Sequence, residues 1–337
     1  MNTITDEIEG RVAGRGPTET LARRLMRGVG THNLSLLVAL ACLVAIFGGM
    51  RPDVFFSARN IENIGQGMAI LGILATAQTI VIISGGLDIS VGAVVGLSTV
   101  CIALGVQATD SALVGILFGL VIGAIAGLVN GAIVTIGGVN AVIATLGTMA
   151  AFRGVAFIMS DGQSISIFHP LFRQIGSGRI LGLQITIEIL IAVVAIFFVL
   201  MRYTVIGRNI YAIGGNPLVA RLAGLNNTGY QIGVYVLSGV AAGLGGLLLA
   251  ARTGSGQPIS GSDGLELQAI TAAVLGGCAL TGGKGSIVGG VLGVIILGVL
   301  NNGMILTSVP TFYQMVARGL LLILAVLVAE QQAKRYS

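Results

Sequence analysis

Long apolar segments with almost no charge dominate this chain and decide what it can fold into. Residues 34–50 and 183–201 are two of them, and each is near the length with which a helix crosses about 30 Å of hydrocarbon. Over the whole chain 55% of the residues are hydrophobic and 9% are charged, which leaves too little polar surface to cover a water-soluble globule. Because the segments are apolar on every face, they predict transmembrane helices and not a β-barrel.

Polar, Gly-rich or charged breaks divide the chain into ten predicted spans. These cover residues 34–50, 64–83, 88–107, 111–136, 141–159, 183–201, 230–251, 266–281, 287–306 and 312–329. The expected fold is therefore an all-α, polytopic helical bundle of about ten transmembrane helices. Residues 34–329 form the transmembrane region, and residues 1–33 and 330–337 form two tails. The first tail lacks an apolar core with a cleavage site, so we expect it to be retained.

An even number of spans puts both tails on the same side, and Lys and Arg predict which side that is. With the tails inside, eleven of the eighteen basic residues are cytoplasmic and five are external. The eleven are Arg11, Arg15, Arg23, Arg24, Arg27, Arg202, Arg208, Arg221, Lys284, Lys334 and Arg335. The net charge of +5 is accordingly explained by the membrane and not by nucleic acid.

The longest internal hydrophilic segment, residues 202–229, contains three arginines and no acid, so we expect it to be cytoplasmic. Within it, "PLVARLAGL" predicts a short helix with Pro217 at its first position and Asn226 and Asn227 after its end. A short helix on the inner face is a contact surface. A basic loop that only fixes topology explains the charge equally well, so the residues alone leave both readings open.

Glycines recur at intervals of four in several spans. The longest series is Gly115, Gly119, Gly123, Gly127 and Gly131, which makes a smooth stripe and predicts an interior helix in close contact with another. A second pattern links residues 84–96, "SGGLDISVGAVVG", with residues 281–293, "TGGKGSIVGGVLG". Similar inner turns in two halves predict an internal repeat of the kind found in transporters.

Enzyme signatures are missing from the sequence, so we expect no catalytic, cofactor or metal residues. The two histidines, His32 and His169, lie in a tail and a loop, and the three cysteines have unrelated spacing. "CALTGGKG" departs from a phosphate-binding loop because Cys278 stands at the first glycine position and Gly285 follows Lys284.

Polar residues inside hydrocarbon must face protein or water, which makes them candidates for a translocation path. The candidates are Gln66, Gln78, Asp88, Asn130, Asn140, Asn301 and Asn302. Asn and Gln also link helices, and for any single residue this role is the commoner one. For Asp88 we expect a structural role at a tight inner turn, where water or helix-end N–H groups meet the carboxylate. Glu188 is the main acid inside a span, and its place near the outer end argues against ion coupling.

Three stretches together resemble the inner-membrane permeases of ribose-type ABC importers. They are "VIISGGLDISVGAVVGL", "GRNIYAIGGNPLVARLAGLN" and "LELQAITAAVLGGCALTGGKGSIVGGVLGVIILGVLNNG". The resemblance implies a subunit of the bacterial inner membrane that imports a monosaccharide. Its implied partners are a second permease subunit, two cytoplasmic ATPases that bind ATP, and a periplasmic or lipid-anchored sugar-binding protein.

The resemblance also implies that residues 202–229 couple the permease to the ATPase. On this chain the coupling residues would be Arg208, Gly214, Gly215, Asn216, Ala220, Arg221 and Gly224. Two alternatives stay open: a branched-chain amino acid permease of the same broad superfamily, and an ion-coupled secondary carrier that works alone.

Overall fold

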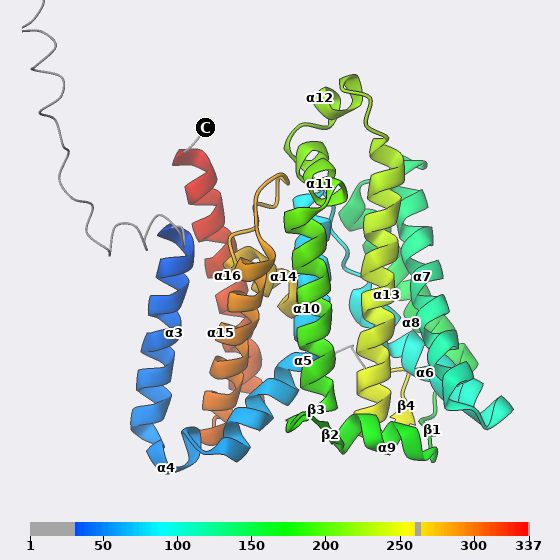
Figure 1. The fold of residues 1–337 in the computed structure, drawn as a ribbon, viewed down its shortest axis with the longest axis vertical. Helices are drawn as coiled ribbons and strands as arrows, with labels where there is room; N and C mark the ends of the chain where they lie inside the picture. The colour runs from blue at the N-terminus through cyan, green and yellow to red at the C-terminus, as the bar shows by residue number, and fades with distance from the viewer. Residues whose placement is uncertain (1–30, 260–263, 336–337) are drawn as a thin grey trace, which may run out of the picture.

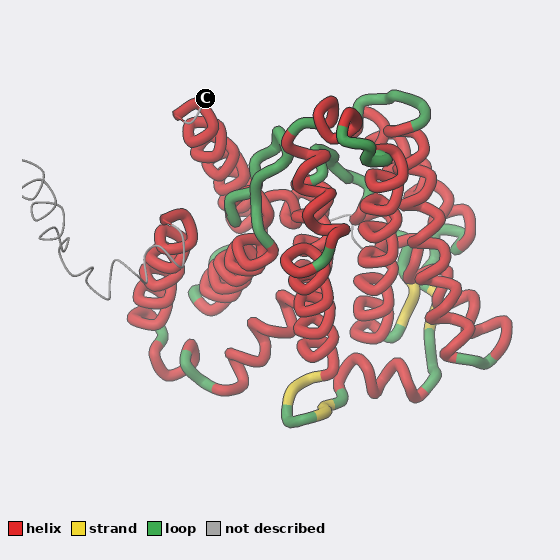
Figure 2. The backbone as a smooth tube through the Cα atoms, turned by 45° about the horizontal axis from the view of Figure 1, so that its top comes forward, coloured by secondary structure: helices red, strands yellow, loops and turns green. Residues whose placement is uncertain are grey.

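The computed structural model describes residues 31–259 and 264–335, and most of these residues are helical (Figures 1 and 2). Seven described helices are long and apolar enough to cross a membrane: α5 (Ala58–Ile83), α6 (Val91–Thr109), α7 (Ala112–Thr135), α8 (Ala141–Met159), α10 (Ile185–Tyr203), α13 (Asn227–Thr253) and α15 (Ile287–Leu306). Further apolar helices are α3 (Thr31–Met50), α14 (Leu265–Leu275) and α16 (Thr311–Arg335). The chain is thus an all-α, multi-pass helical membrane protein.

Short elements connect these helices. The short helices are α4 (Pro52–Phe55), α9 (Pro170–Ser177), α11 (Val205–Gly215) and α12 (Pro217–Leu222). β1 (Ile165–Ser166) pairs antiparallel with β4 (Ser255–Gly256), and β2 (Arg179–Ile180) pairs with β3 (Leu183–Gln184). The strands therefore tie loops together and form no separate layer.

Each predicted span coincides with one apolar helix, and the main differences lie at the ends. The predicted span 266–281 is wrong at its end, because α14 stops at Leu275 where Gly277 turns to a φ of 91°. The predicted span 88–107 starts too early, since Asp88 lies before α6 in a segment without regular structure. Of the first predicted tail, residues 1–30 lie outside the described residues, as do residues 336–337 of the second.

α5 lies at the centre of the bundle. Every residue from Ala69 to Ile83 is buried, and the helix contacts α10, α13, α14 and α15. Its apolar and small side chains form the largest core cluster together with residues of these neighbours. The turns at the end of α5 are therefore anchored in the best-packed part of the molecule.

The glycine stripe of α7 packs as predicted, but α7 is not an interior helix. Gly123 and Gly127 lie against the backbone of α13 at Gly239 and Tyr235, where a side chain would leave no room for such close contact. The opposite face of α7 is exposed, with Leu117 and Val121 about half accessible. A four-residue interval covers only one side of a helix, because 3.6 residues complete a turn, so the stripe could not predict the other side.

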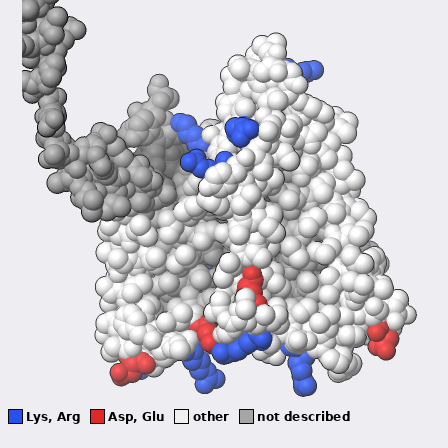
Figure 3. All heavy atoms as spheres, in the orientation of Figure 1, with Lys and Arg blue, Asp and Glu red and all other residues white. Residues whose placement is uncertain are grey.

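The two ends of the bundle differ in charge. α11, α12, the start of α3 and the C-terminus lie at one end, called here the α12 end, and α4, α9, β2 and β3 lie at the other, the α9 end (Figure 1). On the face shown in Figure 3, basic side chains stand without acidic neighbours at the α12 end, and both signs mix toward the α9 end. An uncharged belt separates them. This belt is the part of the surface suited to hydrocarbon.

Candidate coupling and translocation site

The hydrophilic segment between α10 and α13 folds into the two short helices α11 and α12. Thr204 Oγ1 accepts a hydrogen bond from Gly207 N at 3.2 Å at the start of α11. Asn216 Oδ1 accepts one from Val219 N at 3.0 Å at the start of α12. Each cap satisfies an N–H group that the helix itself leaves unpaired, so the sequence defines two separate helices here.

The predicted helix "PLVARLAGL" is present, but it is shorter than expected. Pro217 occupies the first turn of α12 as predicted. The helix ends at Leu222 and not at Leu225, because Gly224 takes a left-handed φ of 84°. Asn227 Nδ2 then donates to the carbonyl oxygen of Pro217 at 2.7 Å, which ties the end of this connection back to the start of α12.

α12 lies at the extreme end of the molecule, beyond the ends of α10 and α13 (Figure 1). Leu218 and Leu222 are 67% and 80% exposed. Arg221 is exposed beside them, while Ala220 is buried. Exposed apolar side chains next to a positive charge, outside the apolar belt, form the kind of surface that binds another protein.

α11 rests on the two turns that the sequence pattern singled out. Gly283 N donates to the carbonyl oxygen of Ile83 at 2.9 Å, so the turn after α5 and the turn before α15 are joined directly. A Cβ on Gly214 of α11 would collide with Ile83 O and Gly283 N. We call the set Gly85, Gly214, Gly282 and Gly283 the glycine junction.

Glycine is needed at the junction for both space and conformation. Gly282 and Gly283 have φ values of 86° and 70°, which side chains rarely allow. Next to them, Tyr211 Oη of α11 donates to the carbonyl oxygen of Gly285 at 2.9 Å. Backbone thus packs directly on backbone here, so α11 and the two turns are in close contact.

The two turns are less alike than the sequence pattern indicates. The turn after α5 covers residues 84–90, whereas the one after α14 covers residues 276–286 and is longer. Ser90 and Ser286 precede α6 and α15 at the equivalent place. When residues 84–96 are aligned with residues 281–293, the starts of α6 and α15 are therefore offset by one residue. The ends of α5 and α14 are offset by more, because the second turn contains extra residues.

The predicted coupling residues occupy different positions along this segment. Gly214 lies in the glycine junction, and Gly215 lies against Gly283. Asn216, Ala220 and Gly224 shape α12, as described above. Arg208 and Arg221 are exposed. Their role in coupling stays a prediction.

Asp88 lies in a buried hydrogen-bonded network between helices. Its carboxylate accepts from Ser90 N at 3.0 Å, from Ser90 Oγ at 2.7 Å and from Ser238 Oγ of α13 at 2.9 Å. Asn130 of α7 donates to Ser90 Oγ at 2.7 Å, and Thr148 of α8 donates to Asn130 Oδ1 at 2.6 Å. These five residues form the Asp88 network, which joins three helices to one turn.

The backbone of the same turn is held from three further sides. Tyr235 Oη donates to the carbonyl oxygen of Leu87 at 3.2 Å, and Ile89 N donates to Thr145 Oγ1 at 3.1 Å. With its amide oriented to donate to Asp88 O, Gln78 also accepts from Asp88 N, both at 3.2 Å. A segment without regular structure thus has several of its backbone groups paired inside the bundle, as membrane depth favours.

Of the two kinds of partner expected for Asp88, water or helix-end N–H groups, the structure shows the second. A helix-end N–H group, that of Ser90, does meet the carboxylate. Asp88 is 1% exposed, so its carboxylate lies inside the bundle, bonded to side chains of Ser90 and Ser238. The glycine turn at Gly85 comes first, and residues 86–89 then have no regular structure before α6 begins.

Of the six other predicted path residues, two lie at Asp88 and four lie elsewhere. Gln78 and Asn130 join it, whereas Asn60 and Asn302 exchange amide hydrogen bonds of 3.1 and 2.8 Å elsewhere. Gln66 donates weakly to Gly176 O at 3.4 Å, and Asn140 caps α8 through Val142 N. Asn301 Oδ1 is buried and has no hydrogen-bond partner among the residues that the structure describes. A role for any of these residues in translocation stays a prediction.

Sequence reasoning missed the hydroxyl residues of the network. Ser90, Thr148 and Ser238 are buried, but serine and threonine are common inside membrane helices as packing residues. Nothing in their spacing marks them, because the helices that carry them are distant in sequence. The one available signal was Asp88 itself, since a buried carboxylate needs several donors.

The fold and these sites define a multi-pass membrane protein with a discontinuous interior segment and a protruding short helix. The chain belongs to the family described as branched-chain amino acid transport system / permease component, whose model matches residues 60–326. No solved structure matches the chain significantly.

Several curated proteins are similar to the chain over most of its length. The ribose import permease protein of Escherichia coli (strain K12) is 41% identical over 296 residues, which cover 87% of this chain and 92% of the relative. The L-arabinose ABC transporter permease protein of Azospirillum brasilense is 41% identical, over 82% of this chain and 81% of its own length. The ribose import permease protein of Bacillus subtilis is 38% identical, over 90% and 94%.

Proposed function

We propose that this chain is the permease subunit of an ATP-driven ABC importer that carries a monosaccharide, such as a pentose or hexose, across the bacterial inner membrane. The names of its relatives support a sugar: those described above are permeases for ribose or L-arabinose. The start of α3 and the end of α16 lie at the basic α12 end, which favours cytoplasmic termini. The α9 end would then face outward, toward a soluble sugar-binding protein.

The observation that carries this proposal is the exposure of α12 and the packing of α11 beneath it. α12 projects Leu218, Leu222 and Arg221 outward, and α11 packs by backbone contact on turns that belong to two different helix pairs. A partner ATPase that moves α12 would therefore tilt α5 and α15 together. Such rigid-body tilting is a known form of alternating access.

The remaining partners follow from the same mechanism. ATP would be bound by two ATPase subunits and not by this chain. A second permease, identical or different, would complete the pathway, with weak polar contacts along it so that sugar is released. Substrate selection would then depend mainly on the binding protein.

A branched-chain amino acid is the second candidate, because the matching family is described by that substrate. The cognate binding protein decides between the two. We expect it to bind ribose or a related sugar in titration calorimetry, and to stimulate sugar uptake by the assembled complex. Tight binding of leucine without sugar binding would refute the sugar proposal and leave the ATP-driven mechanism standing.

A further inference from the structure

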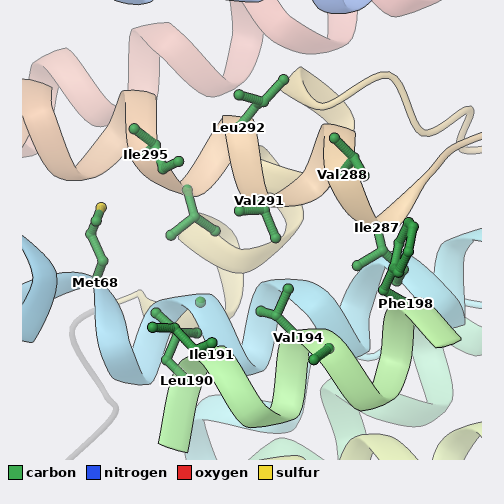
Figure 4. Close-up of a pocket in the computed structure, with 13 residues that line it drawn as sticks. Met68, Leu190, Ile191, Val194, Phe198, Ile287, Val288, Val291, Leu292 and Ile295 are labelled. Carbon is green, nitrogen blue, oxygen red and sulfur yellow. The ribbon is translucent and has the colours of Figure 1, made fainter. Parts of the chain in front are cut away.

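An apolar groove of about 500 Å³ opens between α10 and α15, beside α5 (Figure 4). All thirteen residues that line it are apolar. Val194 and Phe198 of α10 face Val291 and Ile287 of α15, and Met68 lies at the opposite end from Phe198 (Figure 4). The volume falls within the range of about 300–1,000 Å³ that is usual for small-molecule sites.

The shape of this groove suits a hydrocarbon chain better than a protein helix. Its lining on α10 runs from Leu190 to Phe198, which is about 12 Å at 1.5 Å per residue. α10 and α15 contact each other and α5, so the slot between them is too narrow for a helix of about 10–12 Å diameter. A flexible acyl chain needs no such width.

Two basic residues stand at the end of the groove nearest α11. Arg202 follows Phe198 by one helical turn on the same face of α10, and Lys284 comes three residues before Ile287 on the other wall. Both side chains are exposed. Within the described ranges, neither forms an ion pair with an acidic residue.

Tyr211 shows that these two charges share one end of the groove. Its hydroxyl donates to the carbonyl oxygen of Gly285, the residue after Lys284, at 2.9 Å. Burial raises the pKa of Tyr211, and the positive charge of Arg202 opposes that rise. Tyr211 therefore contacts the turn at Lys284 and lies within electrostatic range of Arg202.

We propose that the groove binds an anionic glycerophospholipid, with one acyl chain between α10 and α15 and the phosphate between Arg202 and Lys284. Basic pockets between transmembrane helices bind acidic headgroups in this way, and Arg and Lys form charge-assisted hydrogen bonds with phosphate. The lipid would link the end of α10 to the turn before α15, which is the turn that contacts α11 in the glycine junction. This inference requires only that the chain lies in a membrane and is independent of the transported substrate.

Native mass spectrometry of the purified full chain with dioleoylphosphatidylglycerol or dioleoylphosphatidylcholine tests the proposal. We expect the wild type to prefer phosphatidylglycerol by roughly 30-fold, the contribution expected of two basic residues near a lipid surface. The double variant Arg202→Gln/Lys284→Gln should lose most of this preference. Arg59→Gln/Arg173→Gln removes the same charge from exposed residues of the α9 end and should retain it.

A groove-filling variant tests the acyl chain separately. Ala195 lines the groove and is exposed, so Ala195→Phe should weaken binding of both lipids while the folded chain keeps its size-exclusion profile. Unchanged lipid preference in the Arg202→Gln/Lys284→Gln variant would overturn the proposal. So would an Ala195→Phe variant that binds both lipids normally but changes oligomeric state, since a second copy would then be the occupant. Inorganic phosphate that displaces the lipid completely would contradict a role for the acyl chain.

Discussion

The backbone amide of Gly283 donates to the carbonyl oxygen of Ile83 at 2.9 Å. This bond joins two turns that are separated by most of the chain, and Gly214 of α11 packs on both of its partners. The segment proposed to contact the ATPase is thus in direct contact with the ends of two helix pairs.

Gly214→Ala should destabilise the protein. The new methyl group would meet Ile83 O and Gly283 N, and forcing backbone apart in a packed core costs about 1–3 kcal/mol. Gly215→Ala is the matched control, because a Cβ there meets nothing within 4 Å. Equal unfolding temperatures for the two variants would show that the glycine junction is not closely packed in solution.

Unfolding can be followed with a thiol-reactive dye, since the chain contains no tryptophan. Cys101 and Cys278 are buried and Cys42 is exposed. In a Cys42→Ser background the dye should react only as the bundle opens. Rapid labelling of the folded protein in that background would contradict the burial of the other two cysteines.

Asp88→Asn should lower the unfolding temperature. The amide keeps one acceptor oxygen but turns an NH₂ group toward the donors Ser90 and Ser238, and a buried unsatisfied polar group costs about 1–3 kcal/mol. Asp110→Asn is the control, because Asp110 is exposed and its left-handed φ of 52° is one that Asn tolerates. A drop of the same size in both variants would mean that the Asp88 network contributes nothing specific.

Gly239→Ala should loosen the pairing of α13 with α7, whereas Gly233→Ala on the same helix should not. A Cβ at Gly239 would meet the backbone of Gly123 and Gly127, and one at Gly233 meets nothing within 4 Å. Close packing through small residues is what holds helices together in lipid. If Gly239→Ala were as stable as Gly233→Ala in the dye assay, the two helices would have to be further apart than described.

Arg221→Glu should abolish most ATP-driven uptake by the assembled importer while the chain still inserts into the membrane. The variant reverses the charge that α12 presents beside Leu222, and like charges at a protein interface strongly disfavour the contact. Arg221→Lys preserves the charge and should retain most uptake. Normal uptake by the Arg221→Glu variant would show that α12 does not form the contact with the ATPase.

The spans could be predicted from the sequence because the length and polarity of a segment are local properties. The stripe of α7 from Gly115 to Gly131 likewise identified a packing face. The Asp88–Ser238 bond could not be predicted, since it joins residues 150 positions apart and serine carries no signal of its role. The glycine junction was also hidden, because sequence similarity paired Gly85 with Gly282 as equivalent turns but did not indicate that the two touch each other and α11.

Uptake into proteoliposomes tests the central claim most directly. The complete assembly of permease, ATPase and binding protein would be reconstituted, and entry of radiolabelled ribose would be measured with ATP on the ATPase side. We predict accumulation that requires both ATP and the binding protein. Ribose uptake by this chain alone, driven by a sodium or proton gradient without ATPase, would contradict the account and identify an ion-coupled carrier.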